Sequence, residues 1–167
     1  MKKIVFITLS LLLAVSFWNC EKDDICAEGT PTTPRVIIEF YDNANPNTLK
    51  NVTNLKVTES GQTDGFVFNG VSEIQVPIRT NDIQTILHFT ANGDDSDISN
   101  DNLDEITFNY GTQEVYISRA CGYKMTFQLN TTDGTVLTPD SNNWIQNIVI
   151  SQPNIETENE VHVKIYF

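Results

Sequence analysis

Residues 123–129, with the sequence YKMTFQL, alternate strictly between apolar and polar side chains. The apolar members Tyr123, Met125, Phe127 and Leu129 share one face if this segment is extended. A period of two is typical of a β-strand that turns one face toward a core and the other toward solvent. The stretch therefore predicts a half-buried strand.

The same alternation recurs along most of the chain, and no window sustains a 3.6-residue period. We therefore expect an all-β fold: a single antiparallel β-sandwich of immunoglobulin-like or Greek-key type, with about eight or nine strands, over residues 35–167. The side chains expected to point inward are Val36, Ile38 and Phe40; Val52, Leu55 and Val57; Ile74, Val76 and Ile78; Ile83, Thr85, Leu87 and Phe89; and Ile106, Phe108 and Tyr110.

Four positions interrupt the alternation. The period slips near Asn54, which predicts a bulge. Pro77 lies on an outward position and removes a backbone donor, so its strand is expected at a sheet edge or a bulge. A tight turn is predicted around Gly111, and Cys121-Gly122 predicts a strand–bulge–strand corner.

The N-terminus has the pattern of a secretory signal peptide over residues 1–19. Met1 is followed by Lys2 and Lys3, and only three polar residues interrupt the apolar run of residues 4–18. A short basic region before an apolar run is typical of such signals. An uncleaved transmembrane helix is the alternative, and it is disfavoured because acidic rather than basic residues follow the run.

The junction after this run resembles a lipoprotein signal. The sequence FWNC at residues 17–20 resembles a degenerate lipobox that ends at Cys20, although its first three residues depart from the usual pattern. KDD at residues 22–24 is similar to the export signal of Bacteroidota lipoproteins. The resemblance implies a diacylglyceryl anchor on Cys20, a short linker over residues 20–34, and the outer face of the outer membrane. A periplasm-facing position is the alternative.

The three cysteines, Cys20, Cys26 and Cys121, fit this assignment. If the lipid consumes Cys20, the other two can form a disulfide in an oxidising compartment. In the chain-entropy model such a bridge contributes on the order of 4–5 kcal/mol. Two buried free thiols are the alternative.

Four further segments resemble an uncharacterised lipoprotein family of the Bacteroidota, known only as a domain of unknown function. They are CAEGTPTTPR at 26–35, TFNY at 107–110, RACGYK at 119–124 and HVKIYF at 162–167. The resemblance covers nearly all of the chain after Cys20. It implies one domain and an envelope location, and it implies no activity.

The negative net charge of the chain excludes some classes of binding partner. The chain has a formal net charge of −12, and cleavage before Cys20 would leave 8 basic and 22 acidic residues, a net charge of −14. Nucleic acid and anionic lipid would repel such a protein, so neither is expected as its main partner.

An acidic loop over residues 92–104 is the strongest candidate for a metal site. Asp95, Asp97 and Asp101 repeat at the spacing of the first calcium ligands of an EF-hand. The later part of that motif is missing, because Asn100 and Ile106 stand where Gly and Glu belong. These aspartates are therefore weak calcium candidates, and a solvated loop is the alternative.

Catalytic and cofactor signals are scarce. His88 and His162 are the two histidines, and each alternates with apolar neighbours, so both are predicted to point away from the core. The chain lacks the zinc-protease, Cys-x-x-Cys and phosphate-loop motifs. Trp144 is expected to pack on the core rather than to stack on a sugar. We predict no catalytic residue, no cofactor and no enzyme, with paired carboxylates of a hydrolase as the remote alternative.

The function expected from these signals is a non-catalytic binding module of the cell envelope. Its partner would be an integral outer-membrane protein or a glycan, and the membrane would be reached through the lipid. A structural envelope protein without a small ligand is the runner-up. Only residues 21–25 separate Cys20 from Cys26, so the lipid is expected within about 20 Å of the bridge.

Overall fold

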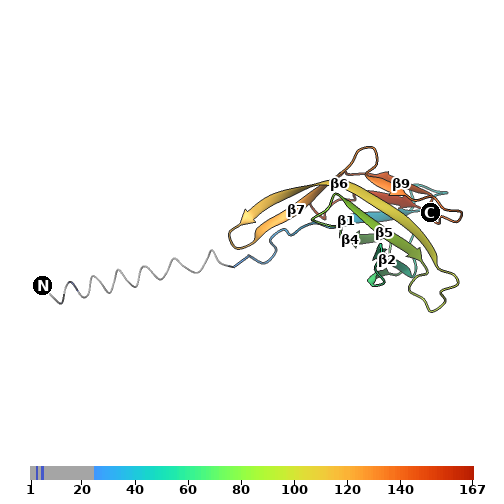
Figure 1. Ribbon diagram of the computed structural model, residues 1–167, viewed down its shortest axis with the longest axis horizontal. Helices are drawn as coiled ribbons and strands as arrows, with labels where there is room; N and C mark the ends of the chain where they lie inside the picture. Colours follow the sequence, from blue (N-terminus) through green and yellow to red (C-terminus); the bar gives the residue numbers. More distant parts are fainter. Residues whose placement is uncertain (1–2, 4, 6–24) are drawn as a thin grey trace. The chain divides into compact units, whose positions relative to one another are not determined.

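The computed structural model describes Lys3, Val5 and residues 25–167 of the chain (Figure 1). Cys20 and most of the predicted signal peptide lie outside the described residues, so both assignments remain predictions. Within the described part, no helix has the length and apolar character needed to cross a membrane.

The described chain divides into two compact units. The larger unit comprises Thr32–Glu114 and Met125–Phe167. The smaller unit comprises Val115–Lys124 together with residues 25–31, which are the continuously described part of Met1–Pro31. The smaller unit is called the tip unit below.

The fold is an all-β sandwich of two sheets, as predicted (Figure 1). One sheet has four strands in the order β4-β1-β11-β9, and the other has seven, in the order β10-β7-β6-β5-β2-β3 with β8 paired to β6. The strands are β1 Val36–Tyr41, β2 Leu55–Glu59, β3 Gly65–Phe68, β4 Glu73–Val76, β5 Gln84–Ala91, β6 Asn102–Ser118, β7 Gly122–Leu129, β8 Thr135–Leu137, β9 Asn147–Ile150, β10 Asn154–Ile155 and β11 Val163–Tyr166.

The strand pairing adds two features that the sequence did not predict. The described chain contains eleven strands rather than eight or nine, because the short β8 and β10 form inside segments that look like loops. The pairing of β1 with β11 is parallel, with Ile38 opposite Val163 and Phe40 opposite Ile165. The two ends of the sandwich sequence thus lie side by side in one sheet.

The core consists of the inward faces of both sheets, and the alternation predicts most of it. Val36, Ile38 and Phe40 of β1 are fully buried, as are Phe89 of β5 and Phe108 of β6. Burying a large apolar side chain contributes about 1.5–3 kcal/mol before entropy is counted. The predicted inward set is therefore confirmed, with two exceptions. Ile83 is 71% exposed, because β5 begins one residue later, at Gln84, and Tyr123, at the start of β7, is 66% exposed.

One predicted interruption is wrong and another is right only in part. No turn forms at Gly111, because β6 continues through it to Ser118. The corner predicted at Cys121-Gly122 is confirmed, but residues 119–121 form a hairpin turn rather than a bulge, and Gly122 adopts a φ of +69° at the start of β7. This left-handed backbone is one that glycine adopts without steric cost.

The other two interruptions lie where a strand begins or ends. Asn54 has a φ of +48° immediately before β2, so the alternation slips there because the strand begins only at Leu55 and not because of a bulge within it. Pro77 directly follows β4, and β4 is an edge strand of the four-stranded sheet, as predicted. Strand β3 lies at the edge of the other sheet.

Candidate functional site

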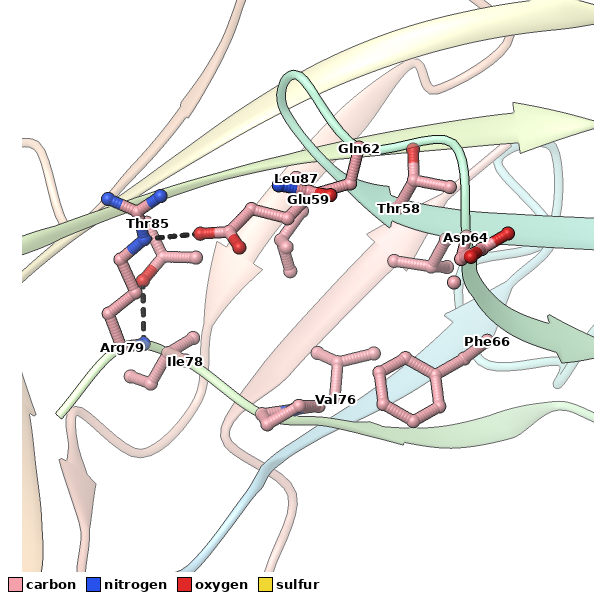
Figure 2. A pocket seen from close by; sticks show the side chains of 13 residues that line it. Thr58, Glu59, Gln62, Asp64, Phe66, Val76, Ile78, Arg79, Thr85 and Leu87 are labelled. Carbon is pink, nitrogen blue, oxygen red and sulfur yellow. Dashed lines mark hydrogen bonds and ion pairs between the residues drawn. The ribbon is translucent and has the colours of Figure 1, made fainter.

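The candidate site is a cleft of about 320 Å³ in the larger unit (Figure 2). It lies at the start of β3 and the end of β4. Its inner surface is apolar. This surface is formed by Val57 of β2, Val76 of β4, Ile78 beyond it and Leu87 of β5. The half-exposed ring of Phe66 lies beside Val76 in Figure 2.

The path of the chain explains why a cleft forms at this place. Residues 69–72 carry the chain from β3 in one sheet to β4 in the other, and Val52 pairs with Val71 to hold this crossing. The cleft lies at the ends of β3 and β4 that are remote from the crossing. Gly65 is needed there, because a Cβ at this position would overlap with the carbonyl oxygen of Val57.

A network of polar contacts fixes the part of the cleft rim that Arg79 forms. The Arg79 guanidinium forms an ion pair with Glu59 of β2, and the Arg79 amide donates to Thr85 Oγ1 at 2.9 Å (Figure 2). The Tyr110 hydroxyl donates to the Arg79 carbonyl oxygen at 2.8 Å and lies 2.5 Å from Thr85 Oγ1. Residue 79 is thus held through side chain and backbone to strands β2, β5 and β6 of the seven-stranded sheet.

The electrostatics of the cleft follow from these contacts. Hydrogen bonding and charge from Glu59 raise the pKa of Arg79, so this guanidinium is positive at every physiological pH. Burial raises the pKa of Tyr110, whose hydroxyl therefore stays protonated as a donor. Because Glu59 neutralises Arg79, the carboxylate of Asp64 leaves the rim with a net negative charge.

The arrangement is suited to binding an apolar group. Its volume lies at the small end of the range for ligand pockets, which is enough for one large side chain or a comparable moiety. The apolar inner surface supplies the burial energy, and Gln62 and Asp64 at the rim supply polar contacts. The sequence pattern did not predict this cleft; the only local signals were the edge proline at 77 and the Phe66–Phe68 pair.

The predicted calcium ligands lie in the loop between β5 and β6. Asp95 accepts hydrogen bonds from the Asp97 amide and from Asn100, and Asp97 accepts two from Ser99. Hydrogen bonds from Ser99 lower the pKa of Asp97. In the described part of the chain, no group of three or more His, Cys, Asp or Glu side chains is arranged to hold a metal. Calcium binding by Asp95, Asp97 and Asp101 stays a prediction.

The prediction for His162 is wrong: the side chain is fully buried rather than exposed. Its Nδ1 accepts the amide hydrogen of Ile37 at 2.9 Å, and the His162 amide donates to the Ile37 carbonyl oxygen at 3.0 Å. His162 precedes β11 and extends the parallel pairing with β1. Burial lowers its pKa, against the opposing effects of Glu160 and Glu158. His88 is partly buried and contacts Glu105 at 3.1 Å.

A second buried ionisable group, Asp104, escaped prediction. It lies at the start of β6, is fully buried, and accepts the amide hydrogen of Ile145 at 2.7 Å. Burial raises the pKa of its carboxyl group. Because Ile145 is itself a core residue, the bond fixes the entry to β9 against the seven-stranded sheet. Asp104 sits where the acidic loop ends, and composition alone gave no reason to separate it from that loop.

The predicted disulfide between Cys26 and Cys121 is confirmed, with Cα atoms 4.8 Å apart. It joins residues 25–31 to the turn of the β6–β7 hairpin within the tip unit. Trp144 is partly buried against the core as predicted, and its indole nitrogen donates to the Phe89 carbonyl oxygen.

Comparison with known proteins gives one match. The model of a family of unknown function (DUF6452) matches residues 52–167. This segment contains every residue that lines the cleft. The searches of curated proteins and of solved structures found no match.

Proposed function

The chain belongs to this family of unknown function, DUF6452, and from that premise we propose that it is a non-catalytic binding module of the cell envelope. The single observation that carries the proposal is the apolar cleft between β3 and β4. An extended polypeptide segment of a partner protein occupies this cleft and buries one large apolar side chain in it.

The edge position of both bounding strands supports a polypeptide as the occupant. Strands β3 and β4 each end their sheet, so each has an outer backbone edge toward which another strand can add. Strand addition supplies main-chain hydrogen bonds, and a pocket beside the edge supplies side-chain specificity. The cleft provides such a pocket directly next to Phe66.

Charge complementarity narrows the chemistry of the partner. Asp64 gives the rim a net negative charge, and the chain as a whole carries −12. A segment in which basic residues flank the apolar side chain would therefore be favoured over an acidic one. A glycan fits less well, because Val57, Val76, Ile78 and Leu87 are aliphatic and offer few hydrogen bonds.

The envelope location rests on the N-terminal sequence. The proposed anchor is a lipid on Cys20 in the outer membrane, with the domain on the cell surface. The confirmed disulfide supports an oxidising compartment, because such bridges are rare in the cytosol. Fatty-acid labelling of the wild type and Cys20→Ala tests the anchor, and equal labelling of the two proteins would disprove it.

The cleft is tested by photocrosslinking in intact cells. A photoreactive amino acid replaces Gln62, which lies on the exposed rim. The expected result is one protein adduct of discrete mass that Phe66→Asp abolishes, because a carboxylate would then lie in the apolar cleft.

The matched control is Val67→Asp, on the neighbouring position of the same strand. Val67 is as exposed as Phe66 but does not line the cleft, so the adduct should persist. An adduct that survives Phe66→Asp, or no adduct at all, would refute a binding role for the cleft. An adduct whose whole added mass is removed by glycosidase would replace the protein partner with a glycan.

A further inference from the structure

The tip unit exposes three large apolar or aromatic side chains. Tyr116 of β6 and Tyr123 of β7 are 55% and 66% exposed, and their rings meet edge to face at 5.3 Å. Ile25, on the segment that the disulfide attaches to this hairpin, is 77% exposed. Contiguous exposed apolar groups of this kind mark interaction surfaces.

The charge of the tip unit differs from that of the rest of the chain. Residues 115–124 contain Arg119 and Lys124 and no acidic residue, and residues 25–31 add only Glu28. The described residues of the tip unit therefore carry a net charge of +1, whereas residues 21–24 (EKDD) before them carry −2 and the whole chain carries −12. The repulsion that disfavours a phospholipid surface for the chain as a whole is absent from the hairpin itself, residues 115–124.

The combination of tyrosines and basic residues matches the chemistry of a membrane–water interface. Tyrosine is enriched there because its ring is apolar and its hydroxyl reaches the headgroups. Arginine and lysine extend an apolar stem along the surface and place their charge beside lipid phosphates. The side chains of Tyr116, Tyr123 and Arg119 supply both elements on one hairpin.

The disulfide limits how far the tip unit can be from the proposed lipid. Cys26 is bonded to Cys121 in the hairpin turn, and only residues 21–25 lie between Cys26 and Cys20. Five residues span at most about 20 Å when fully extended. A lipid on Cys20 would thus hold Cys26, to which the hairpin turn is bonded, within about 20 Å of the bilayer surface, roughly three to four times the thickness of one headgroup layer.

We propose that the tip of the β6–β7 hairpin lies on the phospholipid surface, with Tyr116 and Tyr123 at the headgroup level and Arg119 beside the phosphates. This inference rests on the lipid anchor of the proposed function and is independent of the cleft. The hairpin acts as a second membrane contact, which fixes the orientation of the tip unit on the bilayer where a single lipid would leave it free to rotate.

The test is quenching of tryptophan fluorescence by brominated lipid. Full-length protein carrying Tyr123→Trp is purified from cell membranes and reconstituted in phosphatidylethanolamine and phosphatidylcholine vesicles with acyl chains brominated near the headgroup. The expected result is a blue-shifted emission that brominated lipid quenches. Val149→Trp, on the exposed face of β9, provides the reference for an exposed tryptophan, and both variants retain Trp144 as a common background.

A third variant and a mass measurement separate the outcomes. Arg119→Glu in the Tyr123→Trp protein should weaken the quenching, because the carboxylate repels the phosphates. Mass spectrometry of the N-terminal peptide reports acylation of Cys20 in the same samples. An acylated Tyr123→Trp protein that is not quenched, or is quenched no more than the Val149→Trp protein, overturns the hairpin contact and leaves the anchor intact. A protein without acyl groups overturns the anchor and this inference together.

Discussion

The two halves of strand β6 show how one alternating pattern can have two different physical roles. From Asp104 to Tyr110 every second side chain is buried, whereas Gly111 to Glu114 and Tyr116 are exposed. The backbone is extended throughout, and the first half contributes Ile106, Phe108 and Tyr110 to the core. A strand therefore contributes to stability where other elements pack against its apolar face. An alternating sequence alone does not show whether such elements are present.

The largest expected effect is a difference in the free energy of unfolding between a substitution in the first half of β6 and one in the second half. Phe108→Ala should lower the free energy of unfolding by about 3–5 kcal/mol, because the side chain is fully buried and its removal leaves a cavity. Tyr116→Ala should cost no more than about 1 kcal/mol, chiefly the aromatic contact with Tyr123. Urea denaturation monitored by Trp144 fluorescence measures both. Equal losses would show that the second half is as well packed as the first.

The disulfide stabilises the second half by a different mechanism. Replacing both Cys26 and Cys121 with serine should lower the free energy of unfolding by about 2–5 kcal/mol, chiefly because the unfolded chain gains entropy. Few folded contacts are lost, since Cys26 and its neighbours are exposed. Denaturant melts of the wild type with and without reductant should show the same shift, and the double variant should not respond to reductant. A shift below about 0.5 kcal/mol would refute this entropic role.

The buried pair of His162 and Ile37 should make the core sensitive to pH. Burial lowers the pKa of His162 below its ordinary value of 6.5, so the unfolded chain binds the proton more tightly than the folded chain. Stability should therefore be greatest above pH 6.5 and should fall as the pH drops below it toward the folded-state pKa. Protonation of Nδ1 also removes the acceptor for the Ile37 amide.

Thermal melts between about pH 7.5 and 5, on either side of the ordinary histidine pKa, compare the wild type with His162→Gln. The difference in melting temperature between the two proteins should shrink as the pH falls. Titrating groups that both proteins share contribute equally to both and cancel in this difference. Hydrogen bonding from Arg35 lowers the pKa of Glu158 from 4.5 to about 2, so this carboxylate loses its contribution only below pH 4.5 and does not interfere. A pH-independent difference would exclude His162 as the titrating group.

The sequence predicts the burial of residues whose environment follows from local alternation. It fails for residues whose burial depends on a segment far away in the sequence. It predicts the β1 core residues and the edge position of β4, because Val36, Ile38, Phe40 and Pro77 show their environment in the local pattern. It does not predict burial of His162, because that depends on an amide 125 residues away, at Ile37.

The candidate site was less predictable than the fold. Its lining combines residues from β2, β3, β4 and β5, and no short window contains them together. The disulfide was predictable, because the number of cysteines left one pair once Cys20 was assigned. The cleft depends on the crossing at residues 69–72, which is held by the pairing of Val52 with Val71 and by the hydrogen bond from the Phe40 amide to the Ser72 carbonyl oxygen.

The smallest expected effect concerns two glycines: Gly111 within β6, and Gly122 at the end of the β6–β7 hairpin turn. Gly111 has ordinary strand geometry, and a Cβ added there would meet no atom within 4 Å, so Gly111→Ala should be neutral or stabilise by up to about 1 kcal/mol. Gly122 has a φ of +69°, so Gly122→Ala should destabilise by about 1 kcal/mol. Urea denaturation of the two single variants provides the comparison. If Gly111→Ala were the more harmful change, the break in the pattern at residue 111 would be a true turn, and the continuous β6 on which the contrast between its halves rests would be wrong.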